Sequence, residues 1–188
     1  MDYEEGLAEW IDGEAFLYMS AKYPHQRIVS FLTTFLNAAL GASGKATVLG
    51  GPYAMSSGAG KPGREPDIMV VSAAHHGRLK AAFLDGNPDL VIEVVSDDSD
   101  ERDYVTKFRE YATNGIAEYW IVDSREGHEG ARFFALDSGA YVERQTEADG
   151  MYRSTAFPTL RLRPAWFFED PPPLATALEL ARSAAANE

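Results

Sequence analysis

The sequence LVIEVV at residues 90–95 is the part of the chain that decides the fold. Five of its six residues are aliphatic, and the exception is Glu93. A run that is apolar on both faces is typical of a central strand covered on both sides of a sheet. Because burying a lone carboxylate is strongly unfavourable, Glu93 needs a partner. Either it has a functional role or it forms an ion pair with an arginine at the end of the strand, and the residues alone leave both readings open.

The residues that follow predict a helix and then a second buried strand. Asp98 or Ser99 is suited to cap the helix, and Asn114-Gly115 is suited to end it. The predicted apolar stripe of this helix comprises Tyr104, Val105, Phe108, Tyr111 and Ala112. The sequence YWIV at 119–122 predicts the next strand. A strand–helix–strand order of this kind predicts a right-handed parallel crossover.

Patterning elsewhere predicts a mixed α/β fold for the whole chain. A helix is expected at 25–40, an arm of a hairpin at 15–19, strands at 46–49, 52–55 and 67–71, a hairpin at 132–144 and a C-terminal helix at about 174–185. At this length one domain is the natural count. We therefore expect a single domain over residues 1–188 with a central mixed sheet flanked by helices.

Composition excludes several classes of function. The chain has 188 residues, of which 45% are hydrophobic, and it has no cysteine. The composition is that of a globular protein, and the lack of cysteine excludes zinc-thiolate sites, iron–sulfur clusters and cysteine nucleophiles. No apolar stretch approaches the roughly 20 residues of a membrane span, and the acidic start argues against a signal peptide. We expect a cytoplasmic protein that does not interact with membranes.

The acidic residues are concentrated in two short segments. The formal net charge is −12, and residues 1–14 and 85–103 account for the whole excess. Such runs are usually solvated loops. The alternative is a group of carboxylates gathered around a cation. An anionic substrate would need that cation before it could approach the carboxylates.

Asp67 and Glu93 are the carboxylates whose positions support the second reading. Asp67 opens an apolar run, so if the two strands are neighbours, both side chains lie at one end of the sheet. Converging carboxylates repel unless a cation lies between them, and Mg²⁺, with Mn²⁺ as a substitute, is a suitable hard cation. Lys107 lies on the following helix, four residues after Asp103 and near the flank of the buried face. A solvent-exposed lysine is the alternative.

The chain resembles the Uma-two family of the PD-(D/E)XK nuclease superfamily. The resemblance covers about residues 9–165. It is carried by Pro66-Asp67, residues 89–96, Asp103, Lys107, Tyr111 and residues 115–123, and also by residues 11–14 and 25–29.

The resemblance implies a restriction endonuclease-like core with an added C-terminal hairpin and helix. It also implies Mg²⁺-dependent hydrolysis of DNA phosphodiester bonds, with Asp67, Glu93 and the backbone carbonyl of Val94 as metal ligands. Glu14 matches an N-terminal acid of the family pattern and is a further candidate ligand, although an Asp-Gly-Glu turn also explains it. The superfamily's usual lysine position holds Val95 here, and the resemblance offers Lys107 as a relocated lysine.

Substrate contacts are less defined. The basic residues nearest to the Asp67 strand are candidates for phosphate contacts, with a solvated loop as the alternative: Lys61, Arg64, Arg78 and Lys80. For His25, at the start of the first helix, a surface position or a cap is favoured, and a substrate contact is the alternative. The second hypothesis for the function is a catalytically inactive nuclease-fold protein that binds nucleic acid or protein. The sequence leaves open whether the protein is a homodimer, as many duplex-cutting nucleases are.

Overall fold

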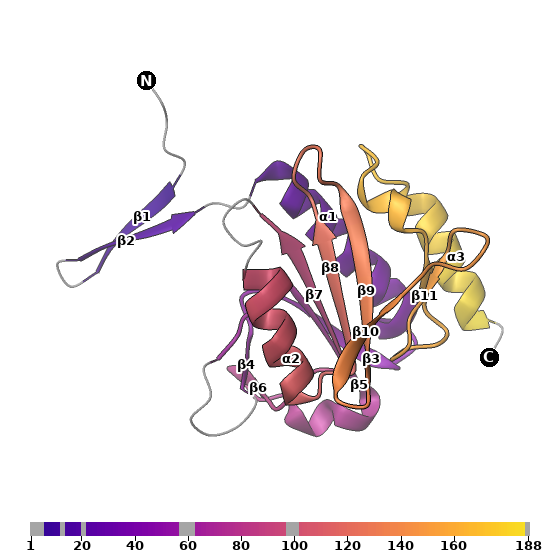
Figure 1. The fold of residues 1–188 in the computed structure, drawn as a ribbon, viewed down its shortest axis with the longest axis horizontal. Coiled ribbons are helices and arrows are strands. Elements are labelled where there is room, and N and C mark those ends of the chain that lie inside the picture. Colours follow the sequence, from indigo (N-terminus) through magenta and orange to yellow (C-terminus); the bar gives the residue numbers. More distant parts are fainter. Residues whose placement is uncertain (1–5, 12–13, 20–21, 57–62, 97–101, 187–188) are drawn as a thin grey trace.

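The structure is a computed structural model that describes residues 6–11, 14–19, 22–56, 63–96 and 102–186, with the backbone alone for 6–11, 14–19 and 184–186. At its centre is a six-stranded sheet with the order β10-β9-β8-β7-β5-β3 (Figure 1). Its strands are β3 (Ala46–Gly50), β5 (Ile68–Ser72), β7 (Leu90–Val95), β8 (Glu118–Asp123), β9 (Gly130–Asp137) and β10 (Ala140–Arg144). The β7–β8 pair is parallel and the other neighbours are antiparallel, so the sheet is mixed, as predicted.

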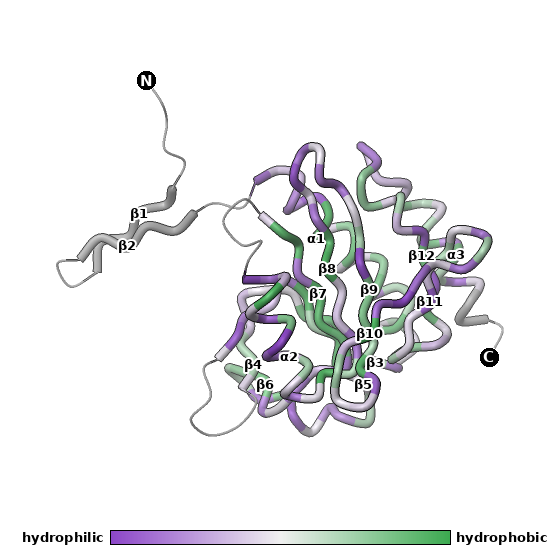
Figure 2. Tube along the Cα trace, in the orientation of Figure 1, coloured by the Kyte–Doolittle hydropathy of each residue, from purple (hydrophilic) through white to green (hydrophobic). Residues whose placement is uncertain are grey.

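The two central strands are buried along their full length. Every residue of β7 and of β8 is buried, and Figure 2 shows hydrophobic residues concentrated there. Alternate residues of β7 point to opposite faces, so Ile92 and Val94 join one core cluster whereas Val91 and Val95 join the other. The apolar run at 90–95 therefore arises from burial on both sides, and Glu93 lies on the same face as Val91 and Val95.

The first face of the sheet is covered by the first and last helices. Helix α1 (Tyr23–Leu36) continues as a π-helical turn, η1 (Asn37–Gly41), and helix α3 (Leu174–Ala186) packs beside them. Side chains at helical spacing on α1 are buried against the sheet: Ile28, Phe31, Leu32, Phe35 and Leu36. The helix predicted at 25–40 is confirmed, except that its last turn is π-helical.

The second face is covered by the crossover between β7 and β8. It consists of a π-helical turn, η3 (Arg102–Lys107), that leads into helix α2 (Phe108–Asn114). Gly115 ends α2 with a left-handed φ of 82°, which glycine adopts without a steric penalty. The predicted parallel crossover is thus confirmed, while the predicted caps Asp98 and Ser99 lie outside the described residues. Wide π-helical turns are uncommon and often occur at functional sites.

The remaining elements are short. They are the hairpin β1 (Gly6–Ile11) and β2 (Glu14–Met19), the parallel pair β4 (Ala54–Ser56) and β6 (Phe83–Asp85), the pair β11 (Tyr152–Arg153) and β12 (Arg161–Leu162), and the 3-10 turns η2 (Ala73–Arg78) and η4 (Pro164–Phe167). The strand expected at 52–55 begins only at Ala54. Among the described helices, none is long and apolar enough to cross a membrane.

A buried carboxylate joins the C-terminal part of the chain to the sheet. Glu118, at the start of β8, is fully buried. It accepts hydrogen bonds from Trp120 Nε1 and the Tyr152 hydroxyl at 2.6 Å each. Its second oxygen accepts from Ser154 Oγ at 2.6 Å and from the Ala156 N–H at 2.7 Å. Four donors offset the cost of burying this charge, so Glu118 has a structural role.

Candidate active site

The pairing of β5 with β7 brings Asp67 next to Glu93. Ile68 lies opposite Ile92 in this antiparallel pair, so the residue before Ile68 faces the residue after Ile92. The Asp67 N–H lies 3.5 Å from Glu93 Oε2, and the Val94 N–H donates to Asp67 Oδ2 at 2.7 Å. The two carboxylates that the sequence singled out therefore meet at one end of the sheet.

Lys107 reaches Glu93 from the turn above. Its Nζ lies 2.9 Å from Glu93 Oε1 and 2.7 Å from Asp103 Oδ1, and its side chain is only 12% exposed. The spacing of four residues on η3 directs Asp103 and Lys107 inward together. The Tyr111 hydroxyl, from α2, donates to Glu93 Oε1 at 2.8 Å. Glu93 Oε1 thus receives two donors, while Glu93 Oε2 is directed toward Asp67.

Burial and neighbouring charges shift the pKa values of Glu93 and Lys107. Burial raises the pKa of Glu93 to about 7, and the negative charges of Asp67 and Asp103 act in the same direction, although Lys107 opposes them. Burial lowers the pKa of Lys107, but the carboxylates of Glu93 and Asp103 more than offset this, so its pKa is raised overall. Lys107 is therefore a cation at neutral pH, while Glu93 can gain or lose a proton near pH 7.

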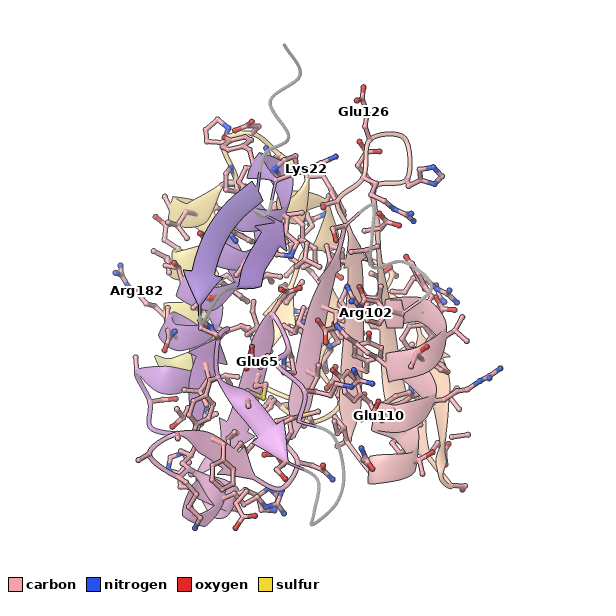
Figure 3. The ribbon with its side chains drawn as sticks, turned by 90° about the vertical axis from the view of Figure 1, so that its left-hand side faces the viewer. Lys22, Glu65, Arg102, Glu110, Glu126 and Arg182 are labelled. Atoms are coloured by element: carbon pink, nitrogen blue, oxygen red, sulfur yellow. The ribbon has the colours of Figure 1, made fainter. Side chains whose placement is uncertain are left out.

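A polar cavity of about 460 Å³ opens onto these groups. Among the described residues that line it, three are cationic, namely Arg64, Arg102 and Lys107. Four of the described lining residues are acidic, namely Glu65, Asp67, Glu93 and Asp103. Figure 3 labels Glu65 and Arg102 on this side of the molecule. The excess of carboxylates in a concave site favours the binding of a cation.

For His25, the favoured interpretation from the sequence is wrong. The residue was expected at the surface or as a helix cap, but its side chain is only 11% exposed, and its Nε2 lies 3.3 Å from Asp67 Oδ2. The position before the first turn of α1 is occupied by Lys22, which forms no side-chain cap. The position of His25 depends on the tertiary structure, because the first turn of α1 packs against the start of β5 at Asp67. Asp103 and Tyr111 were noted in the sequence, but their contacts with Lys107 and Glu93 were not.

Of the residues predicted to contact substrate phosphate, Arg64 lies at the cavity, whereas Arg78 and Lys80 do not. Arg64 lines the cavity, but its Nε and Nη2 donate to the Glu110 carboxylate, with Nη2 2.7 Å from Oε2. That hydrogen bond raises the pKa of Arg64. Arg78 and Lys80 do not line this cavity, because they follow the far end of β5; Arg78 donates to the carbonyl of Asn87 and Lys80 to that of Gly77.

The structure leaves two further candidates undecided. Lys61 lies outside the described residues. Glu14 belongs to β2, of which only the backbone is described. Their roles as substrate contact and metal ligand stay predictions.

The oxygen donors at this site suit a Mg²⁺ ion that keeps several of its water ligands. Among the described residues, no three His, Asp or Glu side chains group closely enough to enclose a metal. Asp67 and Glu93 supply two carboxylates, and Mg²⁺ in nucleotide-processing sites commonly takes one or two carboxylates, waters and substrate phosphate. The Val95 carbonyl accepts from Ser124 Oγ on the β8 side. Because backbone groups alternate along a strand, the Val94 carbonyl faces the Asp67 side and is placed as a third oxygen donor.

Val95 itself contributes no polar group. Its side chain is fully buried in the core cluster with Met69 and Tyr119. The amine beside Glu93 comes instead from Lys107, on a different element. Lys107 therefore lies where the proposed relocated lysine would have to be, beside Glu93.

Comparison with protein families identifies the family of this chain. A model of the Uma2 family, described as "Putative restriction endonuclease", matches residues 2–165. The chain belongs to the Uma2 family. The Uma2 match spans the hairpin β1–β2, the described cavity residues and the whole six-stranded sheet. Comparison with curated proteins finds no match.

A solved structure shares the fold. It is the crystal structure of "a putative nuclease belonging to DUF820" from Anabaena variabilis, which has a TM-score of 0.63 and 17% sequence identity. The alignment covers 95% of this chain and 94% of that one. This Uma2 protein thus shares its fold with that structure over nearly its whole length.

Proposed function

We propose that this Uma2 protein is a Mg²⁺-dependent endonuclease that hydrolyses DNA phosphodiester bonds in the cavity at Asp67, Glu93 and Lys107. The observation that carries the proposal is the meeting of these two carboxylates with the ammonium group of Lys107 in one polar cavity. The family assignment supports the reaction class.

The chain's own residues have separable roles in this proposal. Asp67, Glu93 and the Val94 carbonyl would hold the ion, and a bound Mg²⁺ would polarise a phosphoryl oxygen and acidify a water. Lys107 keeps its proton, so it acts as a fixed positive charge that offsets charge developing on the phosphate, and not as a base. Tyr111 orients Glu93 through its hydroxyl.

A plasmid cleavage assay with Mg²⁺ or Mn²⁺ tests the proposal. We expect Asp67→Asn and Glu93→Gln to lower the rate at least about 100-fold, because each removes a charged metal ligand. Glu179→Gln, an exposed position on α3, is the matched control and should cleave like the wild type. Equal rates for wild type and Glu93→Gln would overturn the proposal. Binding of DNA without cleavage under any of these conditions would favour the inactive, binding-only protein.

A further inference from the structure

A second cavity lies beside the first and shares part of its wall. Its volume is about 530 Å³, and His25 and Ser96 line both cavities. It lies between the start of α1 and the segment that follows β8. Because the two cavities share these residues, they adjoin one another.

The described residues that line the second cavity include more cationic than acidic side chains, although Arg125 is paired with Asp123. Among the described residues that line it, Lys22 and Arg125 are permanent cations, and Glu126 is the one acid. Ser96 and Ser124 add hydroxyl groups. Among the described residues that line the first cavity, in contrast, acidic side chains outnumber cationic ones by four to three.

Arg125 is held by an ion pair, whereas Lys22 directly precedes a helix. Arg125 Nη2 lies 2.8 Å from Asp123 Oδ2, its side chain is 20% exposed, and Nε also donates to Asp123. Lys22 precedes α1, which has 14 residues, no side-chain cap and no acid in its first turn. The backbone N–H groups of an uncapped first turn favour a nearby anion, although Pro24 in this turn supplies no N–H.

We infer that this second cavity binds a backbone phosphate of the nucleic acid whose neighbouring phosphate is cleaved in the first cavity. The inference rests on the proposed function for the choice of ligand. Phosphate contacts of this kind position the substrate and carry no sequence information. Lys22, Arg125 and the start of α1 then hold the substrate strand, and the metal ligands act on the adjacent bond.

Binding of a short fluorescein-labelled DNA duplex, measured by anisotropy in EDTA over a range of NaCl concentrations, tests the inference. Lys22→Gln should weaken binding several-fold and reduce the slope of log affinity against log salt by about one, because one phosphate contact is lost. Glu126→Gln should tighten binding, because it removes the acid from the cavity. Arg182→Gln, an exposed position on α3, changes the net charge as Lys22→Gln does and should have little effect. Figure 3 shows Lys22 and Glu126 at one end of the molecule and Arg182 on another side.

The outcomes separate this inference from the proposed nuclease activity. If Lys22→Gln and Arg182→Gln weaken binding equally, or if Glu126→Gln has no effect, the inference is overturned, whether or not the wild type cleaves plasmid. If Lys22→Gln alone weakens binding and Glu126→Gln tightens it, the phosphate subsite stands. It would stand even for a wild type that fails to cleave, in which case only the nuclease proposal would fall.

Discussion

The Asp67 carboxylate is hydrogen-bonded to the backbone of Val94, whose N–H donates to Asp67 Oδ2 at 2.7 Å. Strand β5 begins at Ile68, so at this point a side chain replaces the next backbone carbonyl of the ladder. The bond satisfies a backbone donor of the central strand and fixes the orientation of the carboxylate. The same bond therefore completes the sheet and positions the candidate metal ligand.

Removal of Lys107 should destabilise the protein. Lys107→Met would leave the buried carboxylates of Glu93 and Asp103 without their cation, at a cost of about 3 kcal/mol in the free energy of unfolding at pH 8. Lys107→Arg, which keeps the charge, should lose less. Urea unfolding in EDTA measures both, and an unchanged midpoint for Lys107→Met would show that the ion pairs contribute nothing.

The free energy of unfolding should fall as the pH rises, because of Glu93. Its pKa is about 7 in the folded protein against 4.5 for an ordinary glutamate, so between these values the folded state binds more protons than the unfolded state. The destabilisation is absent below about pH 4.5 and complete above pH 7, and it is on the order of 3 kcal/mol for a shift of this size. Glu93→Gln should lack this dependence. Metal-free urea unfolding from pH 5 to pH 8 tests this, and parallel curves for the two proteins would contradict it.

Mn²⁺ should raise the melting temperature, and more so at pH 8 than at pH 6. Metal ligands must lose their protons, and Glu93 keeps much of its proton at the lower pH. At a metal concentration 100-fold above Kd we expect an increase of about 5–10 °C at pH 8. Asp67→Asn and Glu93→Gln should reduce the increase strongly, while Glu179→Gln should not. An increase that survives both ligand substitutions would place the metal elsewhere.

Glu118 should matter for stability and not for the metal. Glu118→Ala leaves the buried donors of Trp120, Tyr152 and Ser154 without their acceptor, and we expect a loss of about 3 kcal/mol or more. Its response to Mn²⁺, measured below the lowered melting temperature as the change in urea midpoint, should match that of the wild type. A normal urea midpoint, or a lost response to Mn²⁺, would contradict the structural role assigned to Glu118.

The local patterns at Leu90–Val95 and Tyr119–Val122 were sufficient to predict the two central strands and their parallel crossover. Burial on both faces requires apolar residues at nearly every position, and such a continuous apolar run can be recognised in the sequence. Glu93 was identifiable for the same reason, since a carboxylate in such a strand is unfavourable without a partner.

The spatial partners of these residues were decided by the tertiary structure. That Asp67 faces Glu93 depends on which strand β5 pairs with and in what register, and that His25 contacts Asp67 depends on where α1 docks. The sequence alone determined which residues carry unusual chemistry, because burial and charge are properties of local patterns. Only the folded chain decided which of them meet, because contacts between residues far apart in sequence arise from strand pairing and helix packing, which local patterns do not encode.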